Sequence, residues 1–427
     1  MPAELSPRMI RPMPPLAPDA LERQRRRALA TYFSAAALTS IAYIAFFTVA
    51  AIAAPEMTGS PGSSGLPSAA AVAGTAAAAA LLSAVMARRG RRLGIVLGVA
   101  VGMGGAGLAV LAVLASSLLL LIAGSALIGF GNAAAQLSRY AAADLYPPAR
   151  RAGALGIVVW GSTIGAVVGP NLISPVGTLA EARGFSPLAG GFAMCVLFVC
   201  AALLVSAFGP RAPLEDETDT QGQAGGARTS AIGLLGELLR DVRGRTAVLA
   251  MGSGQLVMTL IMTMTPLHLH EAGHGLGTVG FVISAHTLGM FALSPVSGRL
   301  VDRLGPTPVI VAGFIALAAA GVLAALAPPE SGTALAVPLF LLGLGWNLTF
   351  VAGSSLLASD AALSDRARLQ GVTDSLIWCI AAVASIASGY VVELAGYVTL
   401  SLAGAGAAVL LAAIIAADRR AARPAEA

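Results

Sequence analysis

The chain of 427 residues contains no lysine, so all 26 of its basic side chains are arginine. A phosphate-binding P-loop requires a lysine, and so does covalent catalysis through a Schiff base. Charged residues of both signs are scarce, at 11% of the chain, against roughly 25% in soluble domains. The sequence therefore excludes a P-loop nucleotide motor and a Schiff-base enzyme, and it argues against a soluble protein.

Cysteine is scarce as well. Cys195, Cys200 and Cys379 lie inside apolar runs, where we expect small buried hydrophobic residues and no disulfide framework. A cleavable signal is also lacking, because residues 1–27 are rich in proline and arginine and have no apolar core. We expect this segment to be a cytoplasmic tail.

Apolar residues dominate the remainder. The chain is 57% hydrophobic with a mean hydropathy of +0.82, which is more apolar surface than a soluble fold of this length covers. A helix can reside in lipid because it satisfies its own backbone hydrogen bonds. Apolar runs close to the roughly 20 residues needed to cross a bilayer occur at 28–52, 66–87, 93–113, 117–142, 152–176, 187–208, 246–268, 277–298, 307–327, 333–357, 368–391 and 396–417. We predict an all-α membrane protein with twelve transmembrane helices.

The arginines predict an orientation. If the N-terminus is cytoplasmic, the predicted outer loops hold only Arg183, and the inner segments hold the other arginines. Positive residues collect on the cytoplasmic side of membrane proteins. We therefore predict a multi-pass protein of the cell inner membrane with both termini in the cytoplasm. The net charge of +5 then reflects topology, and no nucleic-acid partner is expected.

One long hydrophilic stretch divides the chain. Residues 209–245 hold an acidic cluster, a segment rich in Gly, Gln and Ser, and an amphipathic piece, as in a flexible linker with a short surface helix. We predict six-helix bundles at 28–208 and 246–417, and a C-terminal tail at 418–427. A shift of 215 residues brings Arg88 onto Arg303 and Gly90 onto Gly305. This match predicts that the bundles are pseudo-symmetric repeats.

A charged turn is predicted after the eighth helix. Residues 298–305 read Gly-Arg-Leu-Val-Asp-Arg-Leu-Gly. This segment resembles the loop signature of the major facilitator superfamily, Gly-x-Leu-x-Asp-Arg-x-Gly. The resemblance implies a twelve-helix transporter whose cytoplasmic side is latched by Gly298, Asp302, Arg303 and Gly305.

The corresponding loop of the first half departs from the signature. Ala87 stands where the family has aspartate, although Arg88, Gly90 and Arg91 remain. The usual latch centred on aspartate is therefore in doubt here. We expect Arg91 to pair instead with Asp144, at the end of the fourth helix.

Helix 5 carries a second family resemblance. Gly156, Gly165, Gly169 and Pro170 match the antiporter motif Gly-x8-Gly-x3-Gly-Pro-x2-Gly-Gly, except that Ile173-Ser174 replaces the last pair. Glycines at this spacing let another helix approach closely, and proline bends a helix. The resemblance implies drug efflux by proton exchange, and the alternative is generic packing of small residues. The family's helix 4 arginine is missing, since its position is Ser125. Arg139, further along, is expected to snorkel or to pair with Asp144, and a role in proton relay is the alternative.

His286 and Asp374 are ionisable residues within predicted spans, where charge is costly and usually functional. His286 is near the middle of helix 8 and Asp374 is about two turns into helix 11. Both are candidates for proton coupling. The alternatives are a neutral histidine held by one interhelical hydrogen bond, and an aspartate that caps a helix contact.

Several other residues are candidates for a substrate cavity, with bundle packing as the alternative. They are aromatic, amide or thioether side chains in four predicted helices: Tyr43, Phe47, Gln255, Met262, Asn347 and Trp378. Phe46, Trp160 and Trp346 are further aromatic candidates. Thioethers suit promiscuous pockets, but they also fill irregular cores.

The segment His270-Glu271-Ala272-Gly273-His274 fits the zinc-protease pattern His-Glu-x-x-His. That chemistry needs both histidines on one face of a continuous helix and a further ligand. Here helix 7 is expected to end and glycines follow, so we expect no metal site. An outer polar cap is favoured, and a pH-sensitive outer gate of His268, His270, Glu271 and His274 is the alternative.

The sequence as a whole predicts a secondary transporter and not an enzyme. It would export a small amphipathic or hydrophobic compound by alternating access, as a monomer in the bilayer, driven by the proton gradient and without a cofactor. The alternative is an uptake carrier or facilitator for a small polar nutrient or vitamin.

Overall fold

The computed structural model describes residues 18–209, 231–328, 330–359 and 363–422. The first half contains α1 (Pro18–Thr58), the short 3₁₀ turn η1 (Pro61–Ser64), α2 (Gly65–Arg89), α3 (Arg91–Leu114), α4 (Leu118–Ala143), α5 (Pro148–Glu181) and α6 (Pro187–Phe208). The second half contains α7 (Ala231–Arg240), α8 (Val242–Glu271), α9 (Leu276–Phe291), α10 (Ser294–Leu304), α11 (Pro306–Leu326), the 3₁₀ turn η3 (Gly332–Leu335), α12 (Ala336–Ser359) and α13 (Leu363–Ala422). The described residues form no strand, so the predicted all-α class is confirmed.

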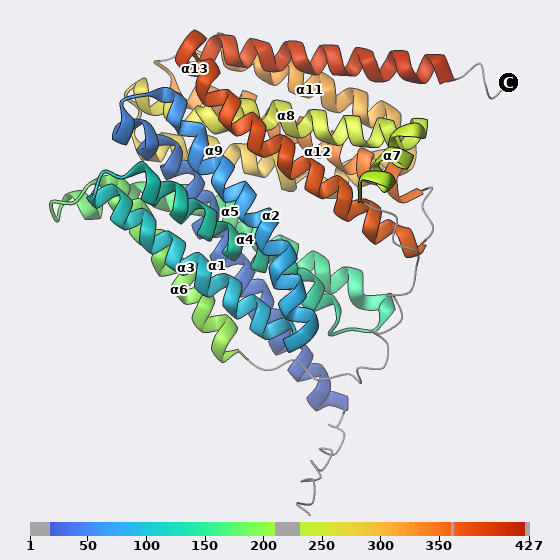
Figure 1. The fold of residues 1–427 in the computed structure, drawn as a ribbon, viewed down its shortest axis with the longest axis horizontal. Helices are drawn as coiled ribbons and strands as arrows, with labels where there is room; N and C mark the ends of the chain where they lie inside the picture. The colour runs from blue at the N-terminus through green and yellow to red at the C-terminus, as the bar shows by residue number, and fades with distance from the viewer. Residues whose placement is uncertain (1–17, 210–230, 329, 360–362, 423–427) are drawn as a thin grey trace, which may run out of the picture.

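Eleven helical segments of the described chain are long and apolar enough to cross a membrane. The last of them, 372–418, has 47 residues, or about 70 Å of helix at 1.5 Å per residue. It is broken at Gly396, whose φ of +79° is strained for any residue with a Cβ. Figure 1 shows the two arms of α13 on either side of this break. Counting each arm as one crossing gives twelve, and that count stays a prediction.

Some predicted boundaries were wrong. Residues 18–27, assigned to the tail, are the first turns of α1, and α13 continues to Ala422. The linker also ends earlier than predicted, because α8 begins at Val242. The amphipathic piece forms α7, and Arg245 ties the start of α8 to Asp418 near the end of α13 at 2.5 Å. Residues 1–17 and 210–230 of the predicted tail and linker lie outside the described residues.

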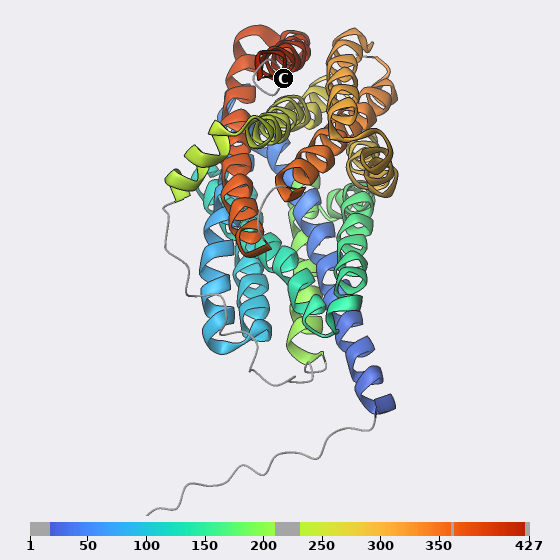
Figure 2. The same ribbon diagram turned by 90° about the vertical axis from the view of Figure 1, so that its right-hand side faces the viewer.

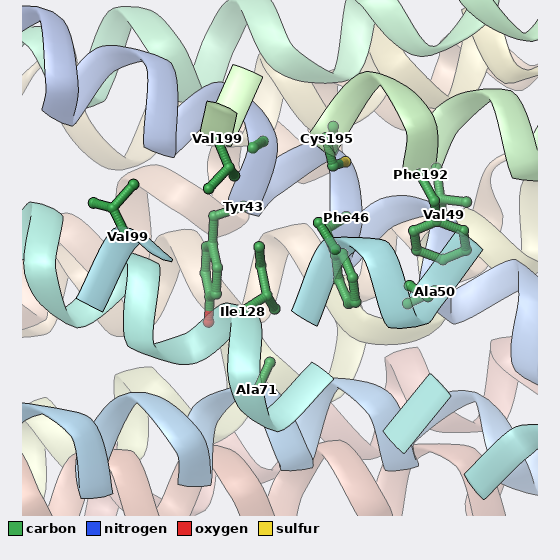
Figure 3. Close-up of a cluster of buried hydrophobic side chains, with 14 of the residues drawn as sticks. Tyr43, Phe46, Val49, Ala50, Ala71, Val99, Ile128, Phe192, Cys195 and Val199 are labelled. Carbon is green, nitrogen blue, oxygen red and sulfur yellow. The ribbon is translucent and has the colours of Figure 1, made fainter. Parts of the chain in front are cut away.

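Each half has its own hydrophobic core. One buried cluster draws on residues 42–202 and the other on residues 247–415. In the first core, Phe46 and Phe192 meet edge to face at 5.0 Å between ring centroids, and Figure 3 shows them beside Val49 and Cys195. Cys195 is buried as predicted, whereas Cys379 is exposed, which contradicts its expected burial.

The halves meet at one end and diverge at the other. In Figure 1 the first-half helices run from upper left to lower right, while those of the second half run closer to horizontal. The halves contact each other through α5 on α9 and α2 on α13. Figure 2 faces the divergent end, with the first half below and the second above. We call the two ends the closed end and the open end.

Candidate functional site: a cavity between the two bundles

A cavity of about 370 Å³ lies between the bundles. Its size falls within the range of small-molecule sites, roughly 300–1,000 Å³. The first half contributes α1, α2, α4 and α5, and the second contributes α8, α9, α12 and α13. The site therefore depends on how the two bundles sit together, because each supplies one wall.

Most of the cavity candidates predicted from the sequence line this space. They come from α1, α8 and α13: Tyr43, Phe47, Gln255, Met262 and Trp378. Both proposed coupling residues, His286 and Asp374, line it as well. The apolar and aromatic lining with a few polar groups is typical of sites that bind small organic molecules.

Asn347 does not line the cavity, so this prediction was wrong. It is 3% exposed and lies against the break between α9 and α10. Its amide donates to the Met290 carbonyl and to Ser294 Oγ, both at 2.7 Å, and accepts from Ser297 Oγ at 2.6 Å. The α9–α10 break frees backbone groups, and the asparagine satisfies one of them. Asn347 thus stabilises the break between α9 and α10.

Two aromatic candidates also lie elsewhere. Phe46 is 1% exposed in the first core. Trp160 is 52% exposed and faces away from the cavity, on the outside of α5. Trp346 does line the cavity, together with Phe291 and Phe350, and these two phenylalanines were not predicted.

Arg139 lies in a different place from the one expected of a residue paired with Asp144. It does not pair with Asp144, but lines the cavity from α4, where Asp374 lines it from α13. The two side chains form no ion pair among the described residues, and Arg139 donates to the Tyr140 hydroxyl at 3.2 Å. Arg139 Nε is buried without a hydrogen-bond partner there, and its guanidinium lies 4.9 Å from the Tyr140 ring centroid.

A sequence signal for the α4 wall exists. Asn132, Gln136 and Arg139 are spaced four and three residues apart in an otherwise small and apolar stretch. That spacing places them on one face of a helix. All three line the cavity, so the periodicity of polar residues would have identified this wall.

The side chain of His286, which belongs to α9, is fully buried and faces α12. Its Nδ1 lies 2.9 Å from the Leu339 carbonyl oxygen, and a carbonyl only accepts, so Nδ1 carries the hydrogen in this contact. Nε2 is buried and has no partner among the described residues. The predicted interhelical hydrogen bond is therefore present, and one ring nitrogen is left over for a proton.

At the open end, Arg91 and Asp144 pair at 3.0 Å, as expected from the altered first-half loop. The predicted turn at 298–305 is mostly helical, since α10 continues to Leu304. Gly305 ends it with a φ of +80° and donates its N–H to the Val301 carbonyl. Asp302 and Arg303 are exposed and form no ion pair within the described ranges. Their latch role stays a prediction.

The helix 5 glycines behave in two ways. A Cβ at Gly165 or Gly169 would overlap a backbone carbonyl of α1, at Ala37 or Ile41 respectively. These two glycines therefore permit close packing of α1 on α5. Gly156 has open space around it, so the same reasoning does not extend to it. Beyond Gly169, the Pro170 carbonyl lies against Gly280 of the other half.

Polar contacts between the halves seal the closed end. Ser60 Oγ donates to Glu393 at 2.8 Å, and His270 Nε2 lies 3.2 Å from Glu56 Oε1. Deeper in the interface, Asn171 donates to Ser284 Oγ at 2.6 Å. These contacts join the two bundles on the opposite side of the cavity from Arg139 and Asp374.

The zinc-protease pattern lacks the helix it requires. α8 ends at Glu271, and Gly273 adopts a φ of +82°, so His274 lies beyond the helix. His270 instead contacts Glu56, and the ring of His268 stacks on Tyr397 at 4.1 Å. His270 and His274 line a second pocket at the closed end with Glu56 and Glu181. These residues thus lie together at the closed end, and their role as an outer polar cap or gate stays a prediction.

Known proteins identify the family. The model of the Major Facilitator Superfamily matches residues 32–278 and 247–426. The "Uncharacterized MFS-type transporter YddS" of Bacillus subtilis is 37% identical over 344 residues, 78% of this chain and 77% of that protein. The riboflavin transporter RfnT of Brucella anthropi is 29% identical over 317 residues, 74% of this chain and 76% of that protein. The chain belongs to the major facilitator superfamily, and it is a transporter of that family.

The fold agrees with solved structures. The crystal structure of the nucleoside transporter NupG superposes with a TM-score of 0.71 at 17% identity, covering 92% of this chain and 98% of that one. At this identity the likeness concerns the fold alone.

Proposed function

We propose that this protein exports a small amphipathic or hydrophobic compound in exchange for protons, by alternating access. The observation that carries the proposal is one cavity between two bundles that contact each other at one end and diverge at the other. Rocking of the halves about such a cavity exposes it to each side of the membrane in turn. The aromatic and thioether lining suits an apolar or amphipathic cargo.

The closed end is proposed to face outward in the cell inner membrane. This assignment rests on the arginines: the predicted outer loops hold only Arg183, and positive residues favour the cytoplasm. In this orientation the cavity opens toward the cytoplasm and both termini lie there. Substrate and protons are the expected partners, with no cofactor and one chain per transporter.

Asp374 and His286 are the proposed coupling groups. Each is an ionisable side chain of the second half that lines the cavity. A proton can couple to the conformation only if it binds the two states with different affinity. Asp374 meets that requirement in principle, because closing the open end would bring it nearer to Arg139 and make its charged form more favourable.

The test is proton movement in proteoliposomes containing the full chain, with a pH-sensitive dye inside. Adding a transported compound should move protons in the opposite direction, and Asp374→Asn with His286→Gln should abolish that movement. Glu22→Gln is the matched control, because Glu22 pairs with Arg26 at the exposed start of α1 and does not line the cavity. If the double variant still couples transport to protons, the assignment of these residues is wrong.

Uptake of a small polar nutrient or vitamin is the second candidate function. A relative at 29% identity is named a riboflavin transporter, and the helix 5 motif is incomplete at Ile173-Ser174. The direction of transport distinguishes export from uptake. Deleting the gene should sensitise cells to toxic compounds if the protein exports, whereas restored growth of a riboflavin auxotroph on low riboflavin would favour uptake.

A further inference from the structure

An aromatic wall occupies the second-half side of the cavity. Trp346 and Phe350 lie one turn apart on α12 and stack at 4.9 Å between ring centroids, with 22° between their planes. Phe291 of α9 meets Trp346 edge on, at 6.0 Å and 74°. All three line the cavity and are only partly buried. Part of their ring surface is therefore left for a ligand.

A buried amide fixes the orientation of this wall. Trp346 Nε1–H donates to Gln255 Oε1 at 2.8 Å, and Gln255 Nε2 donates to Thr259 Oγ1 at 3.0 Å. Gln255 is 6% exposed, and both ends of its amide are already used within the protein. It is therefore poorly suited to binding substrate directly. Its effect is to hold the indole plane in one position before a ligand arrives.

The charges around the cavity are balanced. Besides His286, its charged lining residues are Arg139 from the first half and Asp374 from the second. With one basic and one acidic side chain, the lining has no excess of formal charge of either sign to attract a small ion. Trp378 and Phe47 add aromatic surface from α13 and α1. The lining suits a neutral molecule with a large flat face.

We propose that the cavity selects neutral, flat, fused-ring aromatic compounds that stack on Trp346, with Gln255 as a positioning residue. This inference rests on the proposed transport function and narrows its substrate class. Flatness matters because offset stacking needs two parallel faces. A twisted molecule of the same size reaches the rigid indole with only part of its surface.

The test uses two neutral ketones of nearly equal size, 9-fluorenone and benzophenone. A single bond joins the rings of fluorenone and makes it flat, whereas benzophenone is twisted.

Binding is measured by saturable quenching of tryptophan fluorescence in the full chain in lipid nanodiscs. The substitutions Trp160→Phe and Trp378→Phe leave Trp346 as the reporter. A variant that keeps only Trp160 measures quenching through the lipid. Fluorenone should bind about three- to tenfold more tightly than benzophenone, the size expected of one aromatic pair.

Binding to the remaining variants is measured by displacement of radiolabelled fluorenone, because that signal does not depend on Trp346 fluorescence. Trp346→Phe should retain most of the preference and Trp346→Leu should remove it. Gln255→Met, which keeps the volume but not the acceptor, should lower the preference, and Gln255→Glu should restore it. If Trp346→Leu does not fold, the phenylalanine and Gln255 variants decide the question.

Equal binding of the two ketones, binding of neither, or a preference unchanged by Gln255→Met would overturn the proposal. None of these results bears on the transport function, because proton-linked movement of other compounds is measured separately. Loss of proton-linked transport with the flat preference intact would instead contradict the proposed function alone.

Discussion

At the scale of single residues, position on a helix separates functional polar groups from structural ones. Arg139 and Asp374 line the cavity from opposite bundles. The amide of Asn347, in contrast, forms three hydrogen bonds at a helix break. All three are polar residues within apolar spans, and each had several possible roles. Their roles follow from the direction in which each helix face points.

The first prediction concerns the two charges at the open end. Arg139→Gln and Asp374→Asn should each reduce transport strongly, because each leaves one uncompensated charge in a partly buried position. The exchange Arg139→Asp with Asp374→Arg should recover part of the loss. Initial transport rates in proteoliposomes give the interaction energy of this cycle, which we expect to be about 0.5–3 kcal/mol. Strictly additive losses would show that the two charges act independently.

The second prediction concerns Asn347. Replacing it with leucine removes the amide that the Met290 carbonyl and the Ser294 hydroxyl accept from, and an unsatisfied buried group costs about 1–3 kcal/mol. Thermal unfolding in detergent should therefore occur at lower temperature. Substrate preference should stay the same, since Asn347 does not line the cavity. A changed preference with unchanged stability would return this residue to the binding site.

At the scale of elements, the protein uses glycine and proline to bring helices together and to break them. Gly165 and Gly169 allow α1 to lie on α5, and Gly396 turns α13 through a backbone conformation that other residues avoid. The motif on α5 that resembles that of antiporters is thus partly a packing surface. Its first glycine, Gly156, has no such contact.

The third prediction compares the same substitution at two of these glycines. Gly165→Ala should destabilise the protein by about 1–3 kcal/mol, because the added methyl overlaps the Ala37 carbonyl. Gly156→Ala should be neutral or stabilising by up to about 1 kcal/mol, since alanine favours helix and the space is open. Denaturation midpoints of the purified variants measure both. Equal effects would mean that the α1–α5 contact is loose.

At the scale of the whole molecule, contacts between the halves are concentrated at one end of the cavity. Ser60 with Glu393, and His270 with Glu56, join the bundles there, and α2 on α13 and α5 on α9 form the packed interface. These polar pairs are few and partly exposed, so each contributes little alone. A seal of this kind can be opened at modest cost, as alternating access requires.

The fourth prediction is that locking this seal stops transport. In a background with the three native cysteines replaced by serine, Ser60→Cys with Glu393→Cys should be cross-linked by a short bis-methanethiosulfonate reagent, because Ser60 Oγ reaches the carboxylate end of Glu393 across the interface at 2.8 Å and the reagent spans the length lost with the glutamate side chain. Transport should fall to background and return with a reductant. Each single cysteine variant is the control. Unimpaired transport by the cross-linked protein would mean that this end does not open.

Properties that depend on local composition can be predicted from the sequence alone. Membrane residence, the all-α class and the span 187–208 were predicted correctly, because each follows from apolar content over about 20 residues. The Arg91–Asp144 contact was also predicted, because both residues lie next to helix ends that the apolar runs indicate. Boundaries such as Pro18 and Val242 were missed because helices continue past the apolar run into water.

What tertiary packing decided is which side of each helix faces the cavity, and at which end the bundles part. Gln255 and Asn347 are both amides within apolar spans. Gln255 accepts a hydrogen bond from Trp346 beside the cavity, whereas Asn347 donates to the Met290 carbonyl at the break after α9. In lipid nearly every face of a helix is apolar, so hydrophobic periodicity carries little information about inward and outward faces. Tertiary contacts supply that information, and the hydrogen bonds that separate these two amides join residues 91 and 57 positions apart.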